Sequence, residues 1–108
     1  MSKIKNKETE NNCTIEEIMR VIGGKWTMPI VYSLSSGTKR FKELERSLPS
    51  ISTRMLVKEL KNLEHYKEMK REAFATVPPM VEYSLTERGR ELEPIIFSLY
   101  NWGKKYMD

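Results

Sequence analysis

Cysteine and histidine are nearly absent from this chain, and the shortage of each excludes a class of site. The 108 residues include one cysteine, Cys13, and one histidine, His65. A single cysteine rules out a disulfide within the chain and fits a reducing compartment. A zinc site would need two ligands beyond these two side chains, so we expect no metal. We find no Ser–His–acid set, no glycine-rich phosphate loop and no paired carboxylates, so we expect neither an enzyme nor a cofactor.

Long apolar runs are also missing. No stretch approaches the roughly 20 residues that span a bilayer, so we expect no membrane partner. The first ten residues are polar and charged and lack the apolar segment of a secretory signal, which predicts a cytoplasmic protein. A chain of 108 residues with 39% hydrophobic residues supports one domain with a modest core. We expect a flexible arm over residues 1–12 and a folded domain over 13–108.

Positive charge is concentrated in the middle of the chain. Residues 39–71 carry ten Lys and Arg against five Glu, whereas residues 1–38 have a net charge of +1 and residues 72–108 have −2. Such a focused patch suits a polyanion such as double-stranded DNA. An ordinary solvated basic surface is the alternative that charge alone leaves open.

Apolar periodicity predicts two helices before this basic segment. Thr14 is placed to cap the first, with Glu17 completing a capping box, and Gly23-Gly24 ends it. A second helix is expected over residues 27–35, because Pro29 fits a first turn and apolar residues recur at helical spacing.

The basic segment has the layout of a helix-turn-helix. A short amphipathic helix is expected over Phe41–Leu48, a tight turn over Pro49-Ser50-Ile51, and a longer helix over Ser52–His65, capped by Ser50 or Ser52. The inward residues expected on the longer helix are Met55, Leu56, Leu60 and Leu63.

A hairpin and a terminal helical region are expected next. The segments Met69–Ala75 and Met80–Leu85 are typical of strands, and Pro78-Pro79 fits only the tip between them. Thr86 should cap the last helical region, which Pro94 should kink or restart. The order predicts a mainly α fold with a small β-hairpin wing (α+β), a winged helix-turn-helix.

The helix that starts near Ser52 is the candidate recognition helix. Its first residues, Ser52, Thr53 and Arg54, are placed to meet base edges, and Val57 to touch a thymine methyl group. Lys58 and Lys61 continue the stripe that starts at Arg54 and should meet phosphates.

Further candidates for DNA contact flank this helix. Lys39 and Arg40 stand where a helix dipole adds to their attraction for phosphate. Lys70 and Arg71 in the first strand, and Pro78 at the wing tip, are placed to reach a neighbouring groove. Pairing of Lys70 and Arg71 with Glu82 across the hairpin is an equal alternative.

The two ends of the domain carry more apolar residues than one small core can bury. We expect them to pair with a second copy of the chain, since twofold DNA readers need a dimer. A ligand cage and an ordinary core are the alternatives. The dimer residues expected are Ile15, Ile18, Ile96, Leu99, Tyr100, Trp102 and Tyr106.

The chain resembles the HxlR family of winged-helix transcriptional regulators, which are related in fold to MarR proteins. The residues that carry this resemblance are Ile22-Gly23-Gly24-Lys25-Trp26-Thr27, Arg40-Phe41-Lys42-Glu43-Leu44, Ile51-Ser52 with Met55-Leu56, Leu60 with Leu63-Glu64, the run from Val77 to Thr86, Gly89, and Trp102-Gly103. The resemblance covers residues 13–104. It implies a homodimer on a pseudo-palindromic operator.

The resemblance also implies a sensor in some members, a cysteine near the N-terminus that reacts with electrophiles or oxidants. Cys13 stands at that position, just before a helix whose dipole favours a thiolate. An inert residue at the dimer seam is the alternative. With no second cysteine, alkylation, a mixed disulfide or a Cys13–Cys13 bridge between subunits are the modifications that remain.

One pair of residues departs from the family pattern. Lys67-Glu68 replaces the usual Gly-Leu, so either the helix continues or the turn is strained. Two other functions also stay open. One is a protein-interaction module without DNA binding, and the other is a regulator gated by a non-covalent small molecule between the domain and its end helices.

Overall fold

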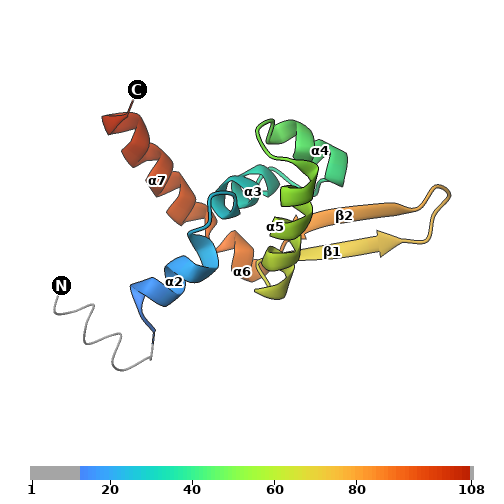
Figure 1. Ribbon diagram of the computed structural model, residues 1–108, viewed down its shortest axis with the longest axis horizontal. Helices are drawn as coiled ribbons and strands as arrows, with labels where there is room; N and C mark the ends of the chain where they lie inside the picture. The colour runs from blue at the N-terminus through green and yellow to red at the C-terminus, as the bar shows by residue number, and fades with distance from the viewer. Residues whose placement is uncertain (1–12, 108) are drawn as a thin grey trace.

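The computed structural model describes residues 13–107, and it has the predicted order of helices and strands (Figure 1). The predicted arm therefore lies outside the described residues. No helix within residues 13–107 has both the length and the hydropathy needed to cross a membrane. The elements are α2 (Ile15–Ile22), α3 (Thr27–Leu34), α4 (Phe41–Ser47), α5 (Thr53–His65), β1 (Met69–Phe74), β2 (Met80–Leu85), α6 (Glu87–Arg90) and α7 (Glu93–Tyr106).

The core forms where α3, α4 and α5 meet the base of the hairpin. Helix α5 contributes Leu56, Leu60 and Leu63, which recur at helical spacing and are all buried. The prediction that Met55 also faces inward was wrong, because 37% of its surface is exposed. The other buried apolar residues are Ile30, Val31, Leu34, Leu44, Leu48, Met69, Tyr83, Leu85 and Ile96.

Local hydrogen bonds define the start and the end of α5. Ser52 caps it, because its Oγ accepts a hydrogen bond of 3.1 Å from the backbone N–H of Met55. The helix ends at His65, and Lys67 then adopts a φ of 65°, the left-handed conformation that glycine adopts without strain. Of the two alternatives at Lys67-Glu68, the strained turn is the one observed.

The strands pair antiparallel as a two-stranded sheet that extends from the core as the wing (Figure 1). Lys39 forms an isolated antiparallel β-bridge with β2. Its backbone N–H donates a hydrogen bond of 2.9 Å to the carbonyl of Tyr83, and its carbonyl accepts one of 2.8 Å from the N–H of Tyr83. The alternative that Glu82 neutralises Lys70 and Arg71 was wrong. Glu82 lies opposite Glu72, and Lys70 Nζ approaches Glu72 Oε1 at 3.9 Å instead.

The terminal helices are more exposed than the core helices, although α7 packs against α3. Pro94 restarts the helix as predicted, because α6 ends at Arg90 and α7 begins at Glu93. In Figure 1, α2 and α7 project from the same side of the core in different directions, and none of the α2 residues is fully buried. Ile96 corrects one dimer prediction: it is only 7% exposed and packs in the core of its own chain.

The turn after α5 places a carboxylate inside the domain. Glu68 is buried, and its Oε2 accepts a hydrogen bond of 2.8 Å from Nε of Arg88 on α6. Helix α6 lies so close that a Cβ on Gly89 would overlap the carbonyl oxygen of Glu68. Burial raises the pKa of the Glu68 carboxyl above its ordinary value, and the Arg88 guanidinium opposes this shift.

This raised pKa predicts a pH-dependent stability. The native state holds the Glu68 proton more tightly than the unfolded chain does, so the contribution of Glu68 to stability is fully present below its unfolded pKa. It is lost as the pH rises through the higher folded pKa. We therefore expect the free energy of unfolding of the wild type to fall, relative to Glu68→Gln, as the pH rises from about 4 towards neutrality.

Urea titrations of both proteins, each at the same protein concentration and at several pH values, measure this difference in free energy of unfolding. Arg88→Gln is the matched control, because it removes the charge that lowers the Glu68 pKa and should make the fall steeper. A free-energy difference between wild type and Glu68→Gln that stays constant with pH would contradict the prediction.

Candidate nucleic-acid interface

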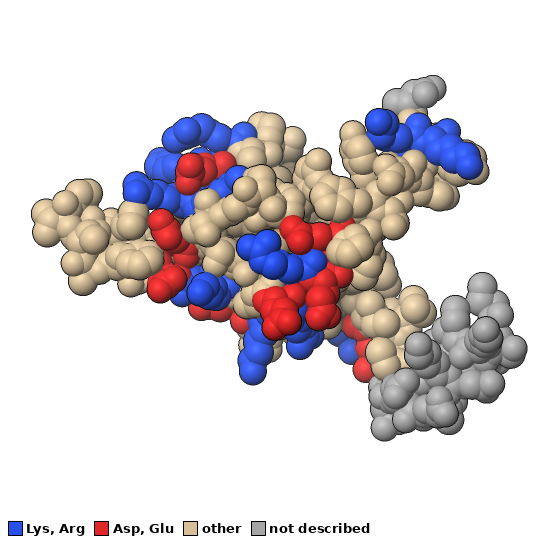
Figure 2. Space-filling model, turned by 180° about the vertical axis from the view of Figure 1, so that it is seen from behind, with Lys and Arg blue, Asp and Glu red and all other residues tan. Residues whose placement is uncertain are grey.

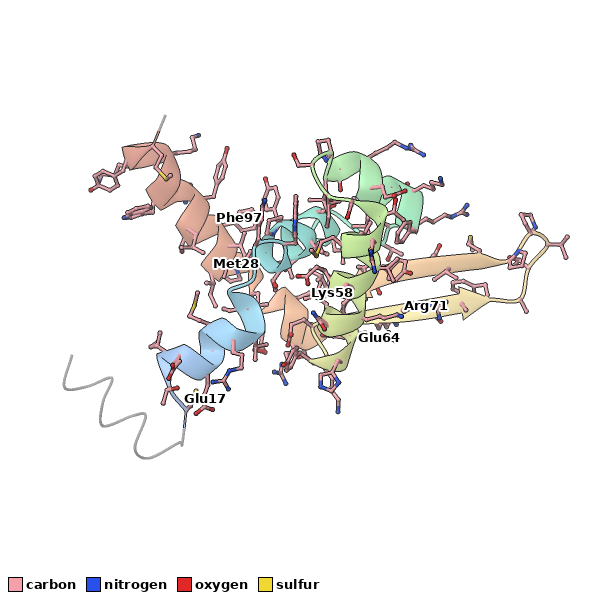
Figure 3. All side chains as sticks on the ribbon, viewed as in Figure 1. Glu17, Met28, Lys58, Glu64, Arg71 and Phe97 are labelled. Atoms are coloured by element: carbon pink, nitrogen blue, oxygen red, sulfur yellow. The ribbon has the colours of Figure 1, made fainter. Side chains whose placement is uncertain are left out.

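The outer face of α5 is a cationic stripe of Arg54, Lys58 and Lys61. All three side chains are exposed and lie opposite the buried leucines, because their spacing places them on one side of the helix. Within residues 13–107 none of the three makes a side-chain hydrogen bond or an ion pair. Figure 3 labels Lys58 in the middle of α5. The stripe therefore keeps its full charge for an external anion.

The first residues of α5 have structural tasks that the sequence did not reveal. The Ser52 Oγ already accepts the capping bond, so its hydroxyl hydrogen is what remains for a ligand. Thr53 Oγ1 donates a hydrogen bond of 2.6 Å to Glu45 Oε2 on α4. Glu45 thus links the two helices. Of Ser52, Thr53 and Arg54, only Arg54 makes no side-chain hydrogen bond or ion pair within residues 13–107.

The two predicted phosphate contacts before α4 differ in how free they are. Arg40 precedes α4, and its backbone N–H donates a 2.8 Å hydrogen bond to Glu43 Oε1. Its exposed guanidinium reaches the wing, where it contacts Met80 Sδ. Lys39 is half-buried and its Nζ donates a 2.8 Å hydrogen bond to Ser36 Oγ, so it is less available than Arg40.

A groove of about 380 Å³ separates α5 from the wing. Phe41, Val57 and Tyr83 line it, together with the charged residues Lys61, Glu64 and Arg71. Figure 3 shows Arg71 on β1 beside Glu64 at the lower half of α5. Successive strand residues face opposite sides of a sheet, so Arg71 shares the α5 side whereas Lys70 lies on the other side. Only one of the two predicted wing cations therefore joins the stripe.

The wing tip and the rear of the molecule are less cationic. Pro78 is exposed at the tip, and its carbonyl accepts a 2.7 Å hydrogen bond from Thr76 Oγ1. Figure 2 shows a tip without charged side chains and, on the rear face, acidic groups mixed with basic ones. Pro78 can thus contribute shape but no charge to an interface.

Cys13 lies at a different place from the cationic stripe. It is exposed and comes directly before Thr14, whose Oγ1 caps α2 by accepting a 3.0 Å hydrogen bond from the N–H of Glu17. Residues of α2, of the turn after α5 and of α6 and α7 enclose a hollow of about 480 Å³, at whose edge Cys13 stands. Modification of its sulfur would therefore act on α2, and not on α5 directly.

No cluster of three or more metal-ligating side chains occurs in the part of the chain that the structure describes. The outer face of α5 instead presents positively charged side chains on a helix that is held by the core. A helix of this kind fits a major groove, and Arg and Lys side chains on its exposed face are of the types that contact bases and phosphates.

Comparison with known proteins agrees with this geometry. The model of the HxlR-like helix-turn-helix family matches residues 21–108. The chain is 47% identical over 96 residues to the uncharacterised helix-turn-helix regulator YdeP of Bacillus subtilis, covering 89% of this chain and 75% of YdeP.

Solved structures of regulators have the same fold. The redox regulator HypR in its oxidised form is 47% identical, with a TM-score of 0.83 over 89% of this chain and 99% of that one. The reduced form of the transcriptional regulator YodB of Bacillus subtilis is 32% identical, with a TM-score of 0.77 over 87% of this chain and 92% of that one. These relatives are regulators and not enzymes. The chain belongs to the HxlR-like helix-turn-helix family and is a winged-helix transcriptional regulator.

Proposed function

We propose that this regulator binds a pseudo-palindromic operator as a homodimer in the cytoplasm, with α5 of each subunit in a major groove. The observation that carries this proposal is the stripe of Arg54, Lys58 and Lys61, which is exposed and unpaired on a helix whose opposite face is locked into the core. Arg54 would read a base edge, and Lys58 and Lys61 would bind phosphates. A module that binds only proteins would show no duplex binding, whereas binding through this stripe should weaken steeply as the salt concentration rises.

The surfaces beside α5 would extend this contact. Arg71 on β1 lines the groove between α5 and the wing. Arg40, directly before α4, lines a second hollow between α4 and the wing. Both are exposed and able to reach the sugar–phosphate backbone. Glu64 lines the same groove as Arg71. Its carboxylate would repel a phosphate that came too close, which restricts how the duplex can dock.

The second copy would bind through α2 and α7. Large apolar side chains are exposed on both helices, with 59% of Trp102 and 64% of Tyr106 accessible. Several large apolar side chains exposed on one helix, as on α7, are typical of a surface that binds another protein. The exposed residues that would form the interface are Ile15, Ile18, Leu99, Tyr100, Trp102 and Tyr106.

Cys13 would make the regulator responsive to electrophiles. Its exposed thiol can add across the activated C=C bond of an electrophile: the S–H and the C=C π bonds break, a C–S bond forms at one carbon, and the other carbon takes up a proton. The bulk added before α2 would change how that helix meets the partner and thus the spacing of the two α5 helices. The support comes from the exposed position of Cys13 and from HypR, a relative described as a redox regulator in oxidised and reduced forms.

Two substitutions on α5 should have different effects on DNA binding. Arg54→Ala should weaken operator binding by about 1–3 kcal/mol and leave binding to random DNA nearly unchanged, because it removes a base contact. Lys61→Ala should weaken binding to all duplexes alike and reduce the slope of log K against log salt by about 1, because it removes a phosphate contact.

Fluorescence anisotropy with operator and random duplexes over a salt series measures both effects. Lys25→Ala, at an exposed position in the turn between α2 and α3, is the control that removes the same charge elsewhere. Equal losses of Arg54→Ala on operator and random DNA would exclude base reading by Arg54.

A charge within the α7 face should separate the two subunits. Leu99 is exposed on α7, so Leu99→Arg should fold yet remain monomeric, because an unpaired guanidinium cannot be buried at an interface. Operator affinity should then fall by about 100-fold or more, since each half-site binds independently. Val77→Arg, at the fully exposed wing tip, should stay dimeric in light scattering. A wild-type protein that is already monomeric would end the proposal.

The sensor role predicts a response that depends on one sulfur atom. Wild-type protein treated with N-ethylmaleimide should lose operator affinity, whereas Cys13→Ser should bind the operator normally and ignore the reagent. Mass spectrometry confirms that the thiol has reacted. Full operator affinity of a completely alkylated wild type would remove the sensor role but not the DNA-binding role.

A further inference from the structure

The hollow beside α2 has the composition of a small-molecule site. Its volume of about 480 Å³ lies within the range of ligand pockets. Apolar side chains supply most of its wall, with Ile18, Val21 and Ile22 from α2 facing Leu92 and Ile95 from the start of α7. Figure 1 shows α2 on one side of this region and the base of α7 on the other.

One polar group in this wall lacks a partner. The Glu68 side chain is 3% exposed, and Arg88 holds its Oε2 at 2.8 Å. The other oxygen, Oε1, is buried and has no hydrogen-bond donor among the described residues. A buried carboxylate oxygen left without a donor is costly, so a ligand that donates to it gains the full value of that hydrogen bond.

The charges around the hollow balance. Glu17 and Glu68 are matched by Arg20 and Arg88, and all four line it. Because Arg88 already neutralises Glu68, an additional cation would not gain the attraction that an isolated carboxylate offers. The balance favours an uncharged ligand that has a hydrogen-bond donor.

We propose that this hollow binds an uncharged, mainly apolar small molecule whose hydroxyl or amide N–H donates a hydrogen bond to Glu68 Oε1. The apolar part of the ligand would pack between α2 and the start of α7. Because Oε1 is buried in the present arrangement, binding requires the wall of the hollow to open slightly, and α2 is the part of that wall that we expect to shift. That shift is inexpensive, since α2 has no fully buried residue.

A matched pair of probes tests the hydrogen bond directly. 4-Ethylphenol and 4-ethylanisole have similar apolar bodies, but only the phenol donates a hydrogen bond. Titrations of the full ¹⁵N-labelled chain at pH 7.5 should move the amide signals of Val21, Glu68 and Leu92, with the phenol binding about tenfold more tightly than the anisole. Glu68→Leu should bind both probes equally, because it removes the acceptor and keeps an apolar wall.

Arg88→Gln is the control, since it leaves Oε1 in place and should preserve the preference for the phenol. If neither probe binds, the proposal is overturned. This result is expected if side chains of a second subunit fill the hollow. Equal binding of both probes, or a preference that survives Glu68→Leu, would overturn it as well. Operator binding without any probe is measured in parallel, so a failed ligand site is distinguishable from a failed DNA-binding role.

Discussion

The packing of one face of α5 into the core is the constraint on which the rest of the structure depends. Leu56, Leu60 and Leu63 are almost completely buried, and burial of side chains of this size contributes roughly 1.5–3 kcal/mol each. This packing fixes the rotation of the helix about its own axis, so the stripe of Arg54, Lys58 and Lys61 can only face outward. The Ser52 cap defines its start, and the bond from Thr53 to Glu45 links it to α4. Charge on a flexible segment would attract DNA equally well but could not select a sequence, because base contacts require fixed positions.

The sequence predicted most of the fold because the strongest signals are local. Ser52, Thr14 and Pro94 each define a helix end through bonds or geometry within a few residues. Met55 and Ile96 show the limit of periodicity. Each is apolar and correctly spaced for the predicted face, but the width of the buried stripe depends on what packs against it. On α5 the neighbours reach only Leu56, Leu60 and Leu63, whereas α7 brings Ile96 against the core. The opposite facing of Lys70 and Arg71 follows from strand alternation, and that signal was present in the sequence.

Features built from distant residues were beyond prediction. Glu68 was visible as a departure from the family pattern, but its burial depends on Arg88, which lies 20 positions further along the chain on another element. A buried carboxylate requires such a partner, because an isolated charge inside a protein would cost several kcal/mol. The same holds for Glu45, whose role depends on the distance to Thr53 and not on any pattern within α4. Pairs of this kind are fixed by the assembled core and leave no periodic trace in the sequence.

The distribution of packing assigns different tasks to different helices. Helix α5, the proposed recognition helix, is held in place by three buried leucines. Helix α2 is the least buried, although Cys13 precedes it and the apolar hollow lies against it. A segment with few buried contacts opens at a low free-energy cost, so a small covalent or non-covalent change there can alter its position without unfolding the domain. A change of similar size at the buried face of α5 would instead destabilise the whole domain, because close-packed interiors adjust very little. A regulatory change is therefore best placed on α2, where movement costs little free energy. In the proposed dimer, its effect would reach α5 by changing how the two subunits are arranged, and not through the core of one subunit.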